Sequence, residues 1–289
     1  MKPLACRACG SVRTEPYLRI RGFDLVRCAH CGSATTDAQM DTARARAYYQ
    51  GSYFRGGDYE DYPRDESIIK SNFERFAQAM IPHGPHGRLL EVGCAYGFFM
   101  DVAQKHWDVE GIDVSEAAIN DARGRHGPRV TCGDLLSAPL EFGGYDWVVA
   151  WDVIEHVDRP RDYLQRMGQL LRPGGHLALT TGDLGSLAAR LMGRRWRLLT
   201  PPSHLTYFTR KGIRTALRQA GLKVISSATA GYERSLSFAV FRMIGSASSS
   251  RLFPEGSSRR RWIERTHFYV DLGDIMFVTA RSPVVGESL

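Results

Sequence analysis

The chain has 289 residues, a formal net charge of +7 and 43% hydrophobic residues, which allows one large α/β domain with a small appendage. It contains no run of 18 or more apolar residues and no secretory hydrophobic segment at the N-terminus, which argues against an integral membrane protein and against a secreted one. We therefore expect a cytoplasmic protein, in which grouped cysteines bind metal and do not form disulfides.

Residues 1–38 predict a small zinc ribbon. Two Cys-x-x-Cys pairs stand 18 residues apart and comprise Cys6, Cys9, Cys28 and Cys31. This spacing is typical of a tetrahedral Zn²⁺ site with four thiolates, and the intervening residues can form a hairpin. Unligated core cysteines would require two coincidental pairs in a segment with few apolar residues, and a redox pair lacks its usual βαβ surroundings. Four thiolates leave no open coordination position, so we expect the metal to be structural.

Residues 39–84 combine a tyrosine-rich stretch with one helix. The stretch Tyr48–Tyr62 is too polar for a strand and too aromatic for a plain linker. We expect it to form a lid over a cofactor or substrate; the alternative is a loop that its tyrosines anchor to the surface. A helix is expected over Asp65–Ile81, where apolar side chains at helical spacing form one stripe that packs on the main body.

The segment most informative about function begins near residue 88. An apolar strand containing Glu91 runs into a turn that starts at Gly93, and the next strand ends at Asp113, twenty residues later. This pattern predicts a cradle for a nucleotide cofactor, in which bare backbone approaches the ligand and Asp113 accepts both ribose hydroxyls. The turn lacks the G-x-G-x-x-G of dinucleotide sites. Glu91 would suit a cationic ligand without a phosphate, such as S-adenosylmethionine.

The remaining elements fit an open α/β sheet. Strands are expected at Val130–Asp134, Tyr145–Trp151, the end of Leu170–Leu179, Leu222–Ile225 and Asp274–Ala280. Thr209 is a plausible N-cap for a helix that Gly221 ends. We expect the Ser-, Gly- and Arg-rich stretch 245–261 to be a mobile insertion between the last two strands.

These motifs, in this order, resemble those of the class I S-adenosylmethionine-dependent methyltransferases. The first motif of that family is E/D-x-G-x-G-x-G, with Ala95 here in place of the middle glycine, and Leu171-Arg172-Pro173-Gly174-Gly175 matches another signature. The resemblance implies a Rossmann-like, seven-stranded sheet with an antiparallel last strand, and an adenine contact from Asp134. The implied cofactor-binding residues are Glu91, Gly93, Ala95, Gly97, Asp113, Val114, Asp134, Leu135 and Trp151.

Two histidines are candidates for the base that removes a proton from the methyl acceptor. His156 follows the strand that faces the cofactor's methyl group in this family, and His204 lies in a segment that usually forms part of the substrate wall. Glu155 precedes His156 and is the third catalytic candidate. The alternative is that His156 only positions its loop.

A divalent ion such as Mg²⁺ is a further candidate at the same loop. Asp152, Glu155 and His156 stand at positions i, i+3 and i+4, so a helical turn would point all three the same way. Two carboxylates and an imidazole could bind an ion that lowers the pKa of an acceptor hydroxyl. The pattern resembles that of ubiquinone-pathway O-methyltransferases and small-RNA end methyltransferases, which are metal-assisted.

The acceptor is not specified by these motifs. The layout resembles bacterial small-molecule methyltransferases, including relatives of the ubiquinone enzymes and deoxysugar C-methyltransferases with a similar zinc module. We expect transfer to a small-molecule or glycan acceptor, to oxygen in preference to carbon, with C-methylation of a nucleotide-linked sugar as an alternative. The net charge and the basic runs at 194–197 and 259–261 raise an RNA or DNA methyltransferase as another.

Two observations argue against a nucleic-acid acceptor. The ribbon has no aromatic stacking face, and the loop after the fourth strand lacks the N/D-P-P-Y/F sequence of base-amine methyltransferases. A cofactor-binding regulator without catalytic activity is a third interpretation. The sequence leaves the oligomeric state open, a homodimer included.

Overall fold

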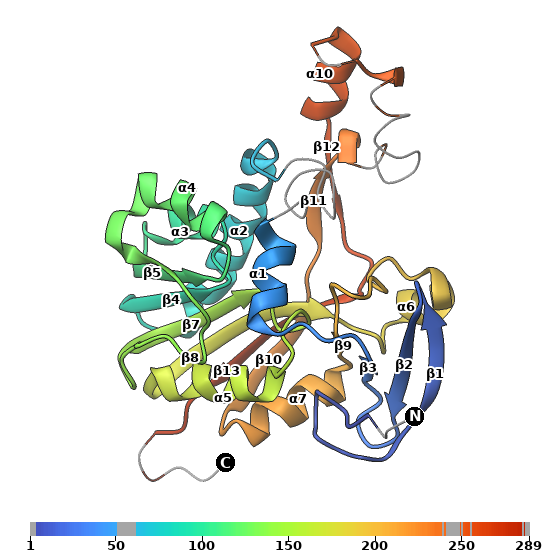
Figure 1. The fold of residues 1–289 in the computed structure, drawn as a ribbon. Coiled ribbons are helices and arrows are strands. Elements are labelled where there is room, and N and C mark those ends of the chain that lie inside the picture. Colours follow the sequence, from blue (N-terminus) through green and yellow to red (C-terminus); the bar gives the residue numbers. More distant parts are fainter. Residues whose placement is uncertain are drawn as a thin grey trace.

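The computed structural model describes residues 4–50, 62–238, 240, 249, 251–254, 256–284 and 286. Its centre is a seven-stranded sheet with the order β10-β13-β8-β7-β4-β5-β6 (Figure 1). The strands are β4 (Arg88–Val92), β5 (Asp108–Asp113), β6 (Val130–Cys132), β7 (Tyr145–Trp151), β8 (Leu171–Gly182), β10 (Lys223–Thr229) and β13 (Ile275–Arg281). Strands β4 to β8 of this sheet are parallel, and β13 runs antiparallel to both β8 and β10. The predicted Rossmann-like sheet is confirmed.

Helices cover both faces of this sheet (Figure 1). One face carries α2 (Glu66–Met80), α3 (Phe98–Ala103) and α4 (Glu116–His126), and the other carries α5 (Pro160–Leu170) and α7 (Arg210–Gln219). Every residue of β7 is buried, as a central parallel strand covered on both sides requires. The helix predicted over Asp65–Ile81 is present as α2.

Local capping fixes where the helices that face the site begin. The Thr209 hydroxyl accepts a hydrogen bond from the Gly212 amide at 3.0 Å, so Thr209 is the N-cap of α7 as predicted. Ser115 caps α4 in the same way, through the Ala118 amide. Ser115 thus begins α4 directly after β5, at the carboxyl edge of the central sheet.

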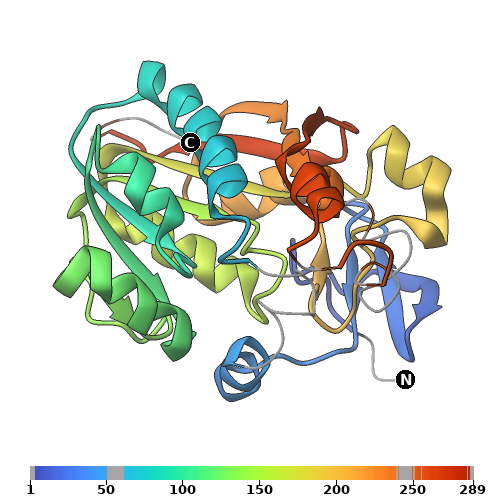
Figure 2. The same cartoon turned by 90° about the horizontal axis from the view of Figure 1, so that it is seen from above.

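The N-terminal residues form a second, four-stranded sheet. Strands β1 (Thr14–Ile20), β2 (Phe23–Cys28) and β3 (Ala34–Thr36) form an antiparallel ribbon, and β3 also pairs with β9 (Thr206–Tyr207). The short helix α1 (Thr42–Gln50) follows. In the view from above, β1 and β2 (dark blue) lie on the side of the molecule opposite α3 and α4 (Figure 2). Because β3 pairs with β9, the ribbon joins the main body through the segment that precedes α7.

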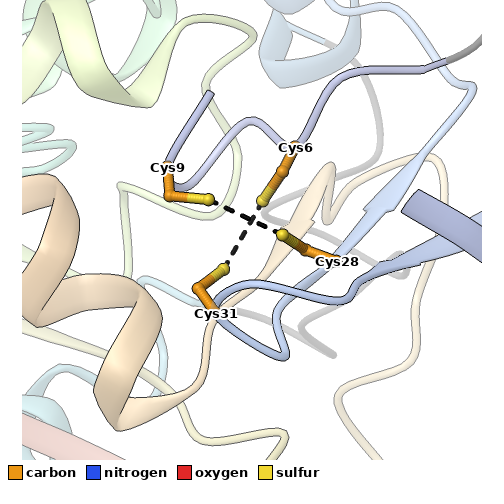
Figure 3. Close-up of side chains that lie close together, drawn as sticks. All are labelled: Cys6, Cys9, Cys28 and Cys31. Carbon is orange, nitrogen blue, oxygen red and sulfur yellow. Dashed lines mark hydrogen bonds between the residues drawn. The ribbon is translucent and has the colours of Figure 1, made fainter. Parts of the chain in front are cut away.

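The four paired cysteines converge at one end of this ribbon (Figure 3). The sulfurs of Cys6 and Cys31 lie 3.6 Å apart, as do those of Cys9 and Cys28, and all four residues are buried. Their sulfur atoms all lie within 4.8 Å of one another, which is the arrangement that a tetrahedral ion needs. The cluster predicted from the spacing is therefore present in geometry.

The chain between β10 and β13 forms more structure than the sequence predicts. An antiparallel hairpin of β11 (Tyr232–Ser235) and β12 (His267–Val270) projects from the sheet and carries α10 (Ser258–Arg265) (Figure 1).

Outside this segment, a further helix, α6 (Leu187–Met192), follows β8. Parts of the predicted mobile insertion, and residues 51–61 of the predicted lid, lie outside the described residues. In the ranges given above, every helix is too short or too polar to cross a bilayer.

Candidate active site

A pocket of about 780 Å³ opens at the carboxyl ends of the parallel strands. Residues that follow β4, β5 and β6 line one part of it, and residues that follow β7 line another. Additional wall comes from α2, from residues 197–204 and from β11. The pocket thus lies where the order of the strands reverses between β4 and β7, which is where open α/β sheets bind their ligands.

The glycine turn after β4 is shaped by contacts that exclude side chains. Gly93 has φ +77°, and a Cβ atom there would lie 2.4 Å from Cγ2 of Val153. Ala95 also has a positive φ, and its amide donates to Oδ2 of Asp113 at 2.9 Å. The Ser115 amide donates to the other oxygen, Oδ1, at 2.8 Å. Asp113 therefore holds the turn in place as well as facing the pocket.

Seven of the nine predicted cofactor-binding residues line this pocket: Gly93, Ala95, Asp113, Val114, Asp134, Leu135 and Trp151. Glu91 and Gly97 are not among the lining residues. Gly97 starts α3 with φ +73°, and a Cβ atom there would lie 2.9 Å from the His126 ring. The lack of a side chain at Gly97 thus leaves room for α3 to pack against α4.

A tyrosine that the sequence does not single out contacts the predicted adenine-binding residue. The Tyr163 hydroxyl, on α5, donates to Oδ1 of Asp134 at 3.0 Å, and the Leu136 amide donates to the same oxygen at 2.9 Å. Asp134 is therefore oriented from two sides. The helical pattern around Tyr163 gives no sign of this role, because it places the residue on a packed helix face.

The three catalytic candidates come together in one corner of the pocket. Glu155, His156 and His204 each offer a ligand atom within 4.8 Å of the others, and the two imidazole ring centroids are 4.6 Å apart. The amides of Leu205 and Thr206 donate to the Glu155 carbonyl, which joins the loop after β7 to the segment before β9. Segments almost fifty residues apart in the sequence thus form one site.

Hydrogen bonds determine the tautomer of His156 and orient the carboxyl group of Glu155 in this corner. Nδ1 of His156 lies 3.0 Å from the Ser203 carbonyl, and since a carbonyl only accepts, Nδ1 carries the proton. In the neutral ring the lone pair is then on Nε2. Oε2 of Glu155 accepts a hydrogen bond from the Thr181 hydroxyl at 3.0 Å.

Burial changes the ionisation of two of these groups. Burial, and secondly the charge of Asp152, raise the pKa of Glu155 to about 8. Burial, and secondly the neighbouring His156, hold the pKa of His204 well below its ordinary value. At neutral pH, without an ion, the corner therefore contains a largely protonated carboxyl and a neutral His204.

The expected helical turn over Asp152, Glu155 and His156 is wrong. Asp152 has φ +52°, outside the right-handed helical region, so its side chain does not point with the other two. Its carboxylate instead accepts hydrogen bonds from the hydroxyls of Thr180 at 2.8 Å and Tyr232 at 2.7 Å. The group of potential metal ligands is therefore Glu155, His156 and His204, with Asp152 outside it.

Much of the pocket wall comes from residues without a sequence motif. Some of these residues belong to the N-terminal third of the sequence, and the others to the segments that follow β8 and β10. The residues are Met40, Tyr62, Ile69, Asn72, Phe73, Arg197, Leu198, Tyr232, Arg234 and Phe238. Of the predicted aromatic lid, Tyr62 lines this pocket and its ring stacks on Phe98 at 5.5 Å, whereas Tyr48 lies in α1 and outside the pocket.

A family model described as a methyltransferase domain matches residues 63–227, which is more than half of the chain. The chain belongs to this methyltransferase family. The matched range runs from just before α2 to β10, so it contains the glycine turn and the corner of Glu155, His156 and His204. The matched residues form a methyltransferase domain.

Curated relatives of this methyltransferase include several O-methyltransferases. A ubiquinone biosynthesis O-methyltransferase of Marinobacter nauticus is 30% identical over 154 residues, which is 47% of this chain and 64% of that protein. The O-methyltransferase cnsE of Penicillium expansum is 24% identical over 188 residues, 61% of this chain and 67% of that protein. The match to the biotin biosynthesis bifunctional protein BioHC of Cellvibrio japonicus covers only 28% of its length. The chain thus spans about two thirds or less of these relatives.

Solved structures share the fold of this methyltransferase. A S-adenosylmethionine-dependent methyltransferase of Thermotoga maritima superposes with a TM-score of 0.52 at 18% identity, covering 81% of this chain and 99% of that one. The [4+2]-cyclase SpnF gives a TM-score of 0.51 at 20% identity, covering 73% and 81%. At such identities the likeness concerns the fold alone.

The residues around the glycine turn fit S-adenosylmethionine as the cofactor of this methyltransferase. Glu91 is 2% exposed, and its Oε2 receives no hydrogen bond from any described residue. Burial, and secondly the charge of Asp113, raise the pKa of this carboxyl well above its ordinary value. Because Glu91 does not line the pocket and its raised pKa favours the neutral carboxyl, the fit rests on Asp113 and Asp134, whose carboxylates line the pocket and can accept hydrogen bonds from the hydroxyl and amine groups of an adenosyl group.

Proposed function

We propose that this methyltransferase transfers the methyl group of S-adenosylmethionine to a hydroxyl oxygen of a small-molecule or glycan acceptor. The observation that carries the proposal is the corner of Glu155, His156 and His204, which lines the same pocket as Asp113 and the glycine turn. The similarity to two O-methyltransferases supports oxygen as the acceptor atom. We further propose the division into a ribbon (1–38), a connecting segment (39–84) and a catalytic domain (85–289).

The residues of the pocket supply alignment, water exclusion and a base. When bound, the cofactor supplies an electrophilic methyl group on a sulfonium. Asp113 and Asp134 hold its adenosyl part, and the rings of Phe73, Trp151 and Tyr232 exclude water from the reacting atoms. Nε2 of His156 would take the proton from the acceptor hydroxyl and so make its oxygen nucleophilic toward that methyl group. The proton then passes from the imidazolium to solvent.

A divalent ion at Glu155, His156 and His204 is a second proposal for the same corner. A carboxylate and two neutral imidazoles are a common ligand set for divalent metals, and a bound ion would act as a Lewis acid that lowers the pKa of an acceptor hydroxyl. Since Nδ1 of His156 faces the Ser203 carbonyl, its Nε2 either binds the ion or serves as the base. The two roles therefore exclude each other.

Electron paramagnetic resonance of Mn²⁺ added to the zinc-loaded protein distinguishes these roles. If the corner binds an ion, Glu155→Gln should abolish one bound Mn²⁺ per chain, because it removes the anionic ligand. Glu141→Gln, at an exposed carboxylate outside the pocket, is the matched control and should keep the ion. Unchanged Mn²⁺ binding in Glu155→Gln would contradict the metal proposal and leave His156 as the base.

Replacing Asp113 by asparagine is expected to weaken binding of S-adenosylhomocysteine about 30-fold. Asparagine removes the charge that would accept from the ribose hydroxyls, and its amide can keep only one of the two backbone hydrogen bonds, from Ala95 and from Ser115, that shape the turn. The loss of one hydrogen bond between the cofactor and a charged group corresponds to about 2 kcal/mol. Isothermal titration calorimetry measures the affinity. Asp108→Asn, at the exposed start of the same strand, should bind as the wild type does.

The acceptor class is tested with a panel of phenols, catechols and sugar nucleotides, analysed by mass spectrometry for the gain of one methyl group and by NMR for the atom that carries it. The proposal expects products methylated on oxygen. Products methylated only on carbon would favour the nucleotide-sugar C-methyltransferase alternative, and turnover with RNA or DNA alone would favour the nucleic-acid alternative.

A further inference from the structure

The hairpin strand β11 forms a wall of the pocket that the family match does not include. The match ends at residue 227, whereas Tyr232, Arg234 and Phe238 all line the pocket. The wall is anchored at two points. The Tyr232 hydroxyl donates to Oδ2 of Asp152 at 2.7 Å, and the Asn72 side chain on α2 exchanges two hydrogen bonds with the backbone of Glu233. The strand is therefore fixed in place before any acceptor binds.

Two aromatic rings hold the guanidinium of Arg234 within this wall. Its Cζ lies 4.6 Å from the ring centroid of Tyr232 and 5.1 Å from that of Phe238. Tyr232 and Arg234 stand two residues apart on one strand, so they share a face. Contacts of this kind use the flat face of a guanidinium and leave the N–H groups at its edge to donate.

Arg234 differs from the other arginines of the pocket in its charge environment. Arg159 pairs with Asp162 at 3.5 Å, and Arg197 pairs with Asp274 at 2.8 Å. Within the described ranges, no carboxylate lies close enough to Arg234 to form an ion pair. A half-buried guanidinium that lies over two aromatic rings and has no carboxylate partner among the described residues is matched to an anion supplied by a ligand.

We propose that Arg234 is the subsite for an anionic group of the methyl acceptor, a carboxylate or a phosphate. The inference rests on the proposed function, because it takes the acceptor to occupy the same pocket as the cofactor. Both oxyanions present paired oxygens that match the edge of a guanidinium. The acceptor would then be an acid with its hydroxyl toward His156 and its anionic group toward β11. The carboxylate of the cofactor is the competing partner for Arg234.

Matched acidic and neutral probes test this subsite in protein saturated with S-adenosylhomocysteine. One pair is 3,4-dihydroxybenzoate and 3,4-dihydroxybenzamide; the other is glucose 1-phosphate and methyl glucoside. We expect the acid of at least one pair to bind about 10-fold more tightly than its neutral partner in the wild type, from a charge-assisted bidentate contact. The pair that discriminates tells whether the group is a carboxylate or a phosphate.

Three variants assign the preference to Arg234. R234Q should reduce the ratio of acid to neutral affinity to about 1, and R234K should keep part of it, because lysine retains the charge and loses the planar fork. R159Q, at the exposed and ion-paired pocket arginine, should keep the full ratio. Calorimetry of S-adenosylhomocysteine with each variant reports on the cofactor site separately.

Two results with the wild type would overturn the subsite: acids that bind no better than their neutral partners, or no binding of any probe. Two results with R234Q would overturn it as well. The first is an unchanged ratio of acid to neutral affinity, and the second is weaker binding of S-adenosylhomocysteine with acid binding intact. The last result would assign the guanidinium to the cofactor. Acid binding that depends on Arg234 without any methyl transfer would leave the subsite standing and count against the proposed O-methylation.

Discussion

Replacing His156 by asparagine is expected to slow methyl transfer about 100- to 1,000-fold, in the range that general bases contribute. Asparagine can still donate to the Ser203 carbonyl, so the loop keeps its 3.0 Å contact, but it offers no basic nitrogen toward the acceptor. Single-turnover kinetics with any acceptor found in the panel measures the chemical step. Affinity for S-adenosylhomocysteine should stay the same, because His156 lies at the acceptor end of the pocket.

A second buried histidine provides the control. His176 lies on β8, stacks on Trp147 at 4.9 Å and does not line the pocket. His176→Asn therefore makes the same substitution at a buried histidine that lies outside the acceptor corner. A rate within a few-fold of wild type for His156→Asn would show that the residue only positions its loop, and His204 would then be the remaining candidate base.

Short-range chemistry explains why the cofactor side of the pocket is predictable from the sequence. Gly93 has φ +77°, a backbone conformation that favours glycine, so the turn leaves a visible glycine in the sequence. Asp113 ends its strand next to that turn and is bonded to it directly. The cysteine pairs are similar, because each pair lies within one tight turn. In all three cases the residues that make the feature are close in sequence or fixed by strand order.

The acceptor side of the pocket depends on contacts between distant segments, and the sequence pattern does not contain them. Tyr232 reaches Asp152 across eighty residues, and Asn72 holds Glu233 across more than one hundred and sixty. An aromatic residue or an arginine on a short strand looks like any other until that strand is placed against the sheet. Arg234 and Tyr163 could not be recognised for this reason.

The error at Asp152 has a specific cause. The spacing of Asp152, Glu155 and His156 suits a helix, and the prediction assumed right-handed backbone after β7. The hydroxyls of Thr180 and Tyr232 instead hold the Asp152 carboxylate and its backbone leaves the helical region. Spacing within a loop therefore predicts which residues are near one another, and it does not predict which atoms converge. Here the third residue that converges with Glu155 and His156 is His204, from another segment.

Removal of zinc is expected to unfold the ribbon and to disable the acceptor corner as well. Four buried thiols lie within 4.8 Å of one another, and a structural zinc site contributes on the order of 10 kcal/mol to folding, so without the ion the ribbon keeps only the apolar cluster of Leu25 and Ala34. Arg7 lies between Cys6 and Cys9, so unfolding of this turn would also displace its side chain. The half-buried guanidinium of Arg7 donates to the Leu205 carbonyl at 3.3 Å and pairs with Asp158 at 2.8 Å, and loss of the metal would break both contacts.

The ribbon is also connected to the acceptor corner by the pairing of β3 with β9, because β9 begins two residues after His204. Cys28→Ser should therefore lose the metal, unfold at a lower temperature and lose most of its transfer activity, as measured by elemental analysis, circular dichroism and turnover. Cys132→Ser, at a cysteine outside the cluster, should match the wild type in all three. A Cys28→Ser protein that is metal-free yet melts and turns over as the wild type does would show that the ribbon supports neither the fold nor the acceptor wall.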